Sequence, residues 1–220
     1  MNPIQCQELT RIYQDGDHSH VAFAPFTAEL PFGEMVCIEG PSGAGKSTLL
    51  TILGSLDINY KGSIKLFGRE LNTLTNAELT QMRREDISIA FQDPALFAHL
   101  SVDENLRLAH QLKRPRTPAR SLGDWLGIFE LNDIHHRFPQ TLSGGERHRV
   151  SLIRALMSDA KVYIFDEPTN SLDLPRTSIV LEQLSMLVAA DKVVIVASHD
   201  PVLRELASRN ILLKNDTPCA

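Results

Sequence analysis

A glycine-rich segment in the first quarter of the chain carries residue types that bind phosphate. Residues 40–47 read Gly-Pro-Ser-Gly-Ala-Gly-Lys-Ser, which matches the pattern GxxxxGK[ST] in full. Glycines let backbone N–H groups approach phosphate oxygens, and a helix start adds unpaired donors and partial positive charge. Lys46 is expected to reach the β- and γ-phosphates, and Ser47 to offer its hydroxyl to Mg²⁺. The expected nucleotide-binding residues here are Gly40, Pro41, Ser42, Gly43, Ala44, Gly45, Lys46, Ser47 and Thr48.

Two adjacent carboxylates, Asp166 and Glu167, follow an apolar run over residues 162–165. Successive side chains leave a strand in opposite directions, so the two acids are expected to have different roles. Asp166 suits the shell of a magnesium ion, and Glu167 suits the orientation or deprotonation of an attacking water. An isolated Asp-Glu pair is more often a solvated strand end, but the phosphate-binding segment upstream favours catalysis.

Gln92 and His199 each follow an apolar run, over residues 87–91 and 193–198. Open α/β sheets bind their ligands at the carboxyl ends of the strands. A lone histidine is more often structural than catalytic, but this position favours function. Gln92 is placed to contact Mg²⁺ or the attacking water without adding charge. With Lys46 and Glu167, these two residues complete the predicted catalytic set.

A second glycine-containing segment, Leu142-Ser143-Gly144-Gly145-Glu146, precedes another helical pattern. Ser143 and the two glycines are typical of a helix cap with bare N–H groups, which is a second place for phosphate. The alternative is an ordinary capped helix. One active site rarely needs two separate phosphate-binding helix starts in one chain. The segment is therefore expected to serve the nucleotide of another subunit.

The elements that position these residues alternate between strand and helix. Strands are predicted over 35–38, 87–91, 162–165, 193–197 and 211–213, and helices over 47–53, 142–157 and 176–190. This alternation predicts an α/β fold with a mostly parallel sheet covered on both faces, and the GxxxxGK[ST] match at residues 40–47, the P-loop, makes it a P-loop NTPase core. Alternating burial around residues 64–66 predicts a small antiparallel β subdomain.

The predicted organisation is a single domain over residues 1–220. Its nucleotide-binding core takes 1–92 and 159–220, and a helical subdomain carrying residues 142–146 takes 93–158, where strand signals are missing and prolines interrupt the chain. The basic run at 113–116 is short and contains a proline, so a solvated loop is favoured over a nucleic-acid patch.

Composition limits the partners and the compartment. The 220 residues carry a net charge of -5, so no general attraction to nucleic acid or anionic lipid is expected. Cys6, Cys37 and Cys219 lack metal-binding spacing and suit a reducing compartment, with Cys37 read as a small core residue. No apolar run approaches the roughly 20 residues that cross a bilayer, so any membrane role is expected to come through a partner.

Together and in this order, the P-loop, Gln92, residues 142–146, Asp166-Glu167, residues 171–173 and His199 make the chain resemble the ABC ATPase family over nearly its whole length. The resemblance implies a head-to-tail homodimer with two ATP molecules between the subunits. In it, Ser143, Gly144 and Gly145 would bind the γ-phosphate held by the opposite subunit, and Asp173 would help couple the two sites.

The resemblance also bears on single positions. Tyr13 lies where the family often places an aromatic residue against adenine, with core packing as the alternative. Glu146 replaces the commoner glutamine, and Leu152 and Ile153 enlarge a helix face that often carries smaller residues. Residues 53–57 and 100–105 look like the lipoprotein-release and macrolide-export branch.

The function expected from the resemblance is ATP binding and hydrolysis, with Mg²⁺, as the cytoplasmic subunit of a transporter held at the inner membrane face by an integral membrane subunit. A soluble ABC-type ATPase with a non-transport role is the alternative. A P-loop kinase would leave residues 142–146 and Asp173 unexplained. Leu96, Phe97 and Leu100 are expected to form a docking groove for the membrane subunit, unless they only pack the insert against the sheet.

Overall fold

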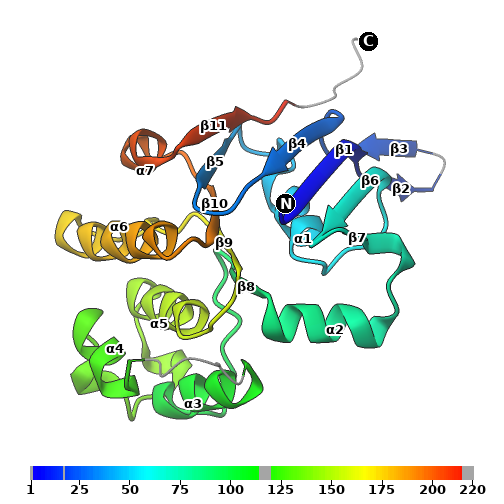
Figure 1. The fold of residues 1–220 in the computed structure, drawn as a ribbon. Coiled ribbons are helices and arrows are strands. Elements are labelled where there is room, and N and C mark those ends of the chain that lie inside the picture. Colours follow the sequence, from blue (N-terminus) through cyan, green and yellow to red (C-terminus); the bar gives the residue numbers. More distant parts are fainter. Residues whose placement is uncertain (1, 17, 114–119, 215–220) are drawn as a thin grey trace.

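A parallel sheet of five strands forms the centre of the computed structural model, which describes residues 2–16, 18–113 and 120–214 (Figure 1). Its strands are β5 (Met35–Glu39), β8 (Ile87–Ala90), β9 (Val162–Asp166), β10 (Val193–Ala197) and β11 (Arg209–Leu212), in the order β11-β5-β10-β9-β8. Each was predicted from its apolar run, although β11 begins two residues before the expected start. Because every neighbouring pair is parallel, the carboxyl ends of all five strands lie at one edge.

The strands of this sheet are buried on both faces. On β5, Val36 and Ile38 pack into one hydrophobic core, while Met35 and Cys37 pack into the other. Strands covered on both faces need apolar residues at every position, which explains the unbroken Val-Val-Ile-Val-Ala of β10. Cys37 is a fully buried core residue, and burial raises the pKa of its thiol to about 11.

A second, antiparallel sheet covers one face together with the helix that follows β5. Its strands are β1 (Ile4–Thr10), β4 (Phe26–Leu30), β6 (Lys61–Leu66) and β7 (Arg69–Glu70), in the order β4-β1-β6-β7. This is the antiparallel subdomain that the alternation at residues 64–66 predicted. A separate hairpin, β2 (Ile12–Asp15) and β3 (His18–Val21), projects beside it and pairs Tyr13 with His20 (Figure 1).

The α-helices of the described chain cover both faces of the parallel sheet and form the insert. They are α1 (Lys46–Leu53), α2 (Asn76–Glu85), α3 (Val102–Lys113), α4 (Leu122–Ile128), α5 (Gly144–Leu156), α6 (Leu174–Ala189) and α7 (Pro201–Leu206). Short 3₁₀ turns lie at Leu71–Thr73, Asn132–Ile134 and Pro139–Thr141. The helix predicted over 142–157 begins at Gly144, because Ser143 is an extended N-cap with φ -64° and ψ 163°. The helix predicted over 176–190 begins at Leu174, because a first turn accepts Pro175.

The chain between β8 and β9 contributes helices but no strand among its described residues. In Figure 1, α3, α4 and α5 lie together below the sheet, with α3 packed against α5. The basic run at 113–116 lies outside the described residues except for Lys113, whose Nζ donates to the carbonyls of Arg83 and Ile87. The subdomain boundaries at residues 93 and 158 stay a prediction.

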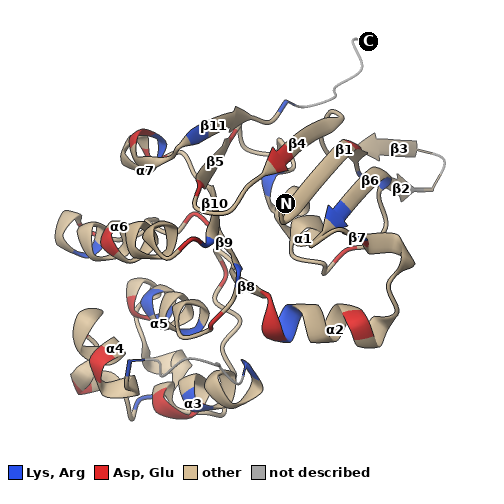
Figure 2. Ribbon diagram, in the orientation of Figure 1, with Lys and Arg blue, Asp and Glu red and all other residues tan. Residues whose placement is uncertain are grey.

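Acidic and basic side chains are interspersed along the elements, as on α2 (Figure 2). Within residues 2–16, 18–113 and 120–214, the structure contains no helix with the length and apolar character of a membrane span.

Candidate functional site

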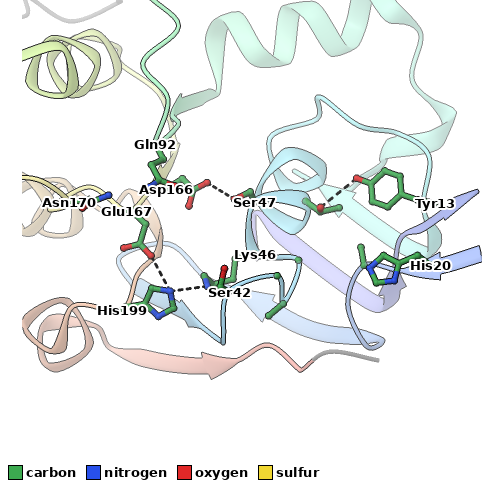
Figure 3. Close-up of a pocket in the computed structure, with 15 residues that line it drawn as sticks. Tyr13, His20, Ser42, Lys46, Ser47, Gln92, Asp166, Glu167, Asn170 and His199 are labelled. Carbon is green, nitrogen blue, oxygen red and sulfur yellow. Dashed lines mark hydrogen bonds and ion pairs between the residues drawn. The ribbon is translucent and has the colours of Figure 1, made fainter. Parts of the chain in front are cut away.

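A cavity of about 620 Å³ opens at the carboxyl edge of the parallel sheet (Figure 3). It is lined by Tyr13, His20, Ala22, Ser42, Gly43, Ala44, Gly45, Lys46, Ser47, Thr48, Gln92, Asp166, Glu167, Asn170 and His199. The glycine-rich segment, Gln92, both carboxylates and His199 come from four separate segments of the chain. The structure therefore gathers in one cavity the residues that the sequence singled out for phosphate, metal and water.

The backbone of the glycine-rich loop is held in conformations that favour glycine. Gly43 and Gly45 have φ values of +78° and +83°, which L side chains rarely adopt. At Gly45 a Cβ would lie 2.3 Å from the carbonyl oxygen of Ala22, so the loop and the end of the β2–β3 hairpin approach as only glycine allows. This close approach fixes the entry into α1, whose first residues, Lys46 to Thr48, line the cavity.

Lys46, the first residue of α1, is buried with 9% of its surface exposed. Its Nζ donates to the carbonyl oxygens of Gly40 at 2.7 Å and Pro41 at 3.2 Å, and lies 3.2 Å from His199 Nε2. An ammonium only donates, so His199 accepts from it through Nε2 with the ring proton on Nδ1. The ammonium group of Lys46 therefore lies over the glycine-rich loop, where phosphate oxygens would bind to it.

Ser47 and Asp166 form the next contact in the cavity. Ser47 Oγ donates to Asp166 Oδ2 at 2.7 Å, and Asp166 itself is buried at the end of β9. Mg²⁺ prefers oxygen ligands and is usually held by one or two protein groups together with phosphates and waters. The hydroxyl of Ser47, the carboxylate of Asp166 and the amide of Gln92 face the same cavity and form a donor set that fits Mg²⁺.

Glu167 turns away from Asp166 because its backbone is left-handed, with φ 50°. Its N–H donates to the carbonyl of Ala197 at 2.8 Å, which joins the ends of β9 and β10. One carboxylate oxygen, Oε2, accepts from Ser198 Oγ at 3.1 Å, and the other, Oε1, lies 3.5 Å from His199 Nε2. The two adjacent acids therefore have separate hydrogen-bond partners, and the different roles expected of them stay a prediction.

Tyr13 lies at the far end of the cavity from Glu167 (Figure 3). Its hydroxyl is 3.4 Å from Thr48 Oγ1, and the guanidinium of Arg11 lies 4.4 Å from the centre of its ring. The side chain is 41% exposed, so it is a surface aromatic and not a core residue. A ring supported on one side by a cation leaves its other face for a planar group.

Ser143, Gly144 and Gly145 do not line this cavity. Ser143 caps α5: its Oγ accepts from the backbone N–H of Glu146 at 3.3 Å, and its own N–H donates to Glu146 Oε2 at 2.7 Å. These bonds to Ser143 hold the pKa of Glu146 below its usual value. The glutamate at this position therefore completes a capping box, and the segment lies apart from the phosphate loop of its own chain.

Asp173 is likewise outside the cavity and caps α6. Its Oδ1 accepts from the backbone N–H of Arg176 at 3.1 Å, and its Oδ2 accepts from Arg176 Nη1 at 2.6 Å. Within one chain, both oxygens of this carboxylate thus accept hydrogen bonds from a residue of α6. A coupling role would require the second subunit that the resemblance implies.

The sequence did not single out several residues that the structure brings to the site. His20, Ala22 and Asn170 line the cavity, and Ser198 binds the carboxylate of Glu167. Ser198 and Asn170 each lie within three residues of a predicted site residue, which is a weak signal. His20 carried no signal, because its place depends on pairing with Tyr13 in the hairpin.

Comparison with known proteins gives a consistent family. The model of a protein family described as ABC transporter matches residues 23–170. The macrolide export ATP-binding/permease protein MacB of Salmonella choleraesuis (strain SC-B67) is 36% identical over 208 residues, which cover 92% of this chain and 32% of that protein. A probable export ATP-binding/permease protein of Pseudomonas fluorescens (strain Pf0-1) is 38% identical over 213 residues, covering 94% and 32%. The chain spans about a third of the length of these relatives.

Solved structures agree with this family. A dimeric, post-hydrolysis structure of the ATP-binding cassette MJ0796 bound to ADP and Pi has a TM-score of 0.87 and 31% identity, covering 96% of this chain and 94% of that one. A dimeric structure of MJ0796 described as a bacterial ABC transporter cassette has a TM-score of 0.86 and 32% identity over the same shares.

The backbone of the glycine-rich loop predicts different losses of unfolding free energy for alanine at Gly43 and at Gly45. Gly43→Ala meets no atom within 4 Å and should lose about 1–2 kcal/mol of unfolding free energy from the left-handed backbone alone. Gly45→Ala adds a backbone collision and should lose about 1–3 kcal/mol more. Urea denaturation without nucleotide measures both variants. Equal losses would contradict the close approach of Gly45 to Ala22.

Proposed function

The chain belongs to the ABC transporter family and is an ATPase that binds ATP, and from this premise we propose that two copies close head to tail on two ATP molecules and drive a membrane-spanning transporter subunit. The observation that carries the proposal is the meeting of Lys46, Ser47, Gln92, Asp166, Glu167 and His199 in one cavity. The chain would act at the cytoplasmic face of the membrane.

We assign phosphate binding to residues 40–48, by way of backbone N–H groups and the ammonium of Lys46. The contacts of Lys46 with Gly40 and Pro41 place its charge over the loop before phosphate arrives. Ser47, Gln92 and Asp166 would hold Mg²⁺, which neutralises phosphate charge when bound. The ring of Tyr13 would stack on the adenine.

For hydrolysis we assign the orientation and deprotonation of water to Glu167. The carboxylate faces the cavity and is separated from Asp166, so it is free of the metal shell. The ring of His199, between Lys46 and Glu167, would donate to the γ-phosphate from Nε2 once Lys46 turns to the nucleotide and the ring proton moves from Nδ1 to Nε2. A change at the phosphate would be transmitted through Gln92 to the segment that follows it.

The head-to-tail dimer explains why Ser143 lies outside the cavity. The oxygen of its hydroxyl accepts the bond that caps α5, which leaves the hydroxyl proton free to donate to a phosphate. A Cβ on Gly144 would meet nothing within 4 Å, so a ligand has open access to this helix start. The dimeric cassettes solved for MJ0796 support a homodimer of this chain.

Transport is favoured over a non-transport role because the relatives named above are export ATP-binding/permease proteins. The proposed docking surface for the membrane partner is the loop after Gln92. Phe97 is 49% exposed there, while Leu96 packs against the core of the insert, so the packing alternative applies to Leu96. The buried amide of Asn105 donates to the carbonyls of Phe97 at 3.1 Å and Leu100 at 2.9 Å, which holds the loop in shape.

Glu167→Gln should retain ATP binding and lose hydrolysis by about 10²–10⁴-fold, because the amide cannot accept a proton from water. With cleavage stalled, size-exclusion chromatography with ATP should show a dimer. Glu182→Gln, an exposed change on α6, is the matched control and should hydrolyse ATP at the parental rate. Parental hydrolysis by Glu167→Gln would remove the assignment of the catalytic carboxylate.

Complementation tests whether Ser143 acts on the nucleotide of the other subunit. A Ser143→Arg chain and a Lys46→Ala chain should each be inactive alone, yet their heterodimer carries one site with both defects and one with neither. Mixing should therefore restore part of the hydrolysis. Lys46→Ala mixed with Glu167→Gln is the control, because every site then keeps one defect and no activity should return. Verified heterodimers without recovery in the first mixture would contradict the arrangement.

Phe97→Ala should weaken capture of the membrane subunit while ATP binding and folding persist, since interface energy concentrates in a few aromatic anchors. A loss of at least tenfold in co-purified partner is expected. Phe32→Ala, which removes a similarly exposed ring in the loop between β4 and β5, should leave capture unchanged. Full capture by Phe97→Ala would place the partner elsewhere.

A further inference from the structure

Ser198 is a buried hydroxyl beside the catalytic carboxylate. It follows β10 directly and has 0% of its surface exposed. Its Oγ makes two contacts, one with Glu167 Oε2 at 3.1 Å and one with the backbone N–H of Asp200 at 3.1 Å. The N–H of Asp200 can only donate, so the oxygen of Ser198 accepts there and its one proton points to Glu167.

The surroundings of Ser198 make this orientation stiff. The backbone N–H of Ser198 donates to Ile38 on β5 at 3.3 Å. Asp200 is held in turn, because its Oδ1 accepts from the N–H of Val202 at 2.9 Å and its Oδ2 accepts from Thr169 Oγ1 at 2.8 Å. Hydrogen bonds thus run without a break from Glu167 through Ser198 and Asp200 to Thr169, and they join the loops after β9 and β10.

The two oxygens of Glu167 have different surroundings as a result. Oε2 is tied to Ser198, whereas Oε1 lies on the side of His199 Nε2 at 3.5 Å. The carboxylate side chain is 16% exposed, so only a small part of it meets the cavity. A carboxylate that rotated freely would present either oxygen to a bound water, and the bond from Ser198 removes that freedom.

We propose that Ser198 is a positioning residue for ATP hydrolysis, which holds Glu167 Oε2 so that Oε1 faces the attacking water. The inference rests on the proposed role of Glu167 as the catalytic carboxylate. It deepens that role, because it names the group that sets the direction of the base. Ser198 does not itself line the cavity and acts on it through its hydrogen bond to Glu167, so its effect is on turnover and not on binding.

The test compares Ser198→Ala and Ser198→Thr in the full chain, assembled with its partner. Ser198→Ala should lower kcat by about tenfold to a hundredfold, because small misplacement of a catalytic group has effects of this size, while KM for ATP changes less than about twofold. Ser198→Thr keeps the hydroxyl and should recover most of the lost kcat.

Ser88→Ala is the matched control for the loss of a buried serine hydroxyl. Ser88 is 1% exposed and donates to the carbonyl of Ala155 at 2.9 Å, a carbonyl that Ser158 also satisfies. It should leave kcat at the parental value. Thermal denaturation of all variants confirms that the chains fold.

Three results overturn the inference: a Ser198→Ala variant that folds and keeps its kcat, a loss that appears equally in KM, or a Ser198→Thr variant that fails to recover. The failure of the underlying assignment looks different. If Glu167→Gln hydrolyses ATP normally, Glu167 is not the catalytic carboxylate. If Glu167→Gln is inactive while Ser198→Ala is not, only the positioning role is wrong.

Discussion

The register of the three central strands is the constraint on which the site depends. β10 pairs with β5 and β9 at once, so that Ala197 lies opposite both Ile38 and Asp166. β9 and β10 therefore end level and β5 ends one residue further on, so the residues that follow them emerge side by side at one edge. A slip of one residue would turn every side chain of β10 to the other face and move Ser198 and His199 away from Glu167. The unbroken burial of both faces makes such a slip costly.

The residues at and after the strand ends set the arrangement of charge in the cavity. One lysine and two acids line the same cavity, and each has its own hydrogen-bond partner. Lys46 donates to loop carbonyls, Asp166 accepts from Ser47, and Glu167 accepts from Ser198. These contacts hold the polar groups at the cavity before phosphate enters, and polar groups positioned in advance stabilise developing charge.

The cavity within one chain gathers the glycine-rich loop, Gln92, Glu167 and His199, but the helix start at Ser143 does not line it. The capping box of Ser143 and Glu146 keeps the end of α5 ordered without a ligand. A helix end that is already formed can bind phosphate from a second subunit without first being folded.

The sequence by itself determined the central strands, the phosphate loop and the roles open to Asp166 and Glu167. These features depend on local patterns: apolar runs of strand length, glycines before a lysine, and acids at a strand end. Its errors lay at element ends, as at Gly144 and Leu174, where a cap or a proline in the first turn decides the boundary.

Only the tertiary structure decided which groups hydrogen-bond to one another and which line the same cavity. Tyr13 faces His20 because of the hairpin register, and Ser198 reaches Glu167 because β9 and β10 end level. No spacing along the chain encodes these contacts, since they join residues brought together by packing. The left-handed backbone of Glu167 is likewise not encoded by spacing along the chain. It occurs together with a hydrogen bond from its N–H to the carbonyl of Ala197 on the neighbouring strand.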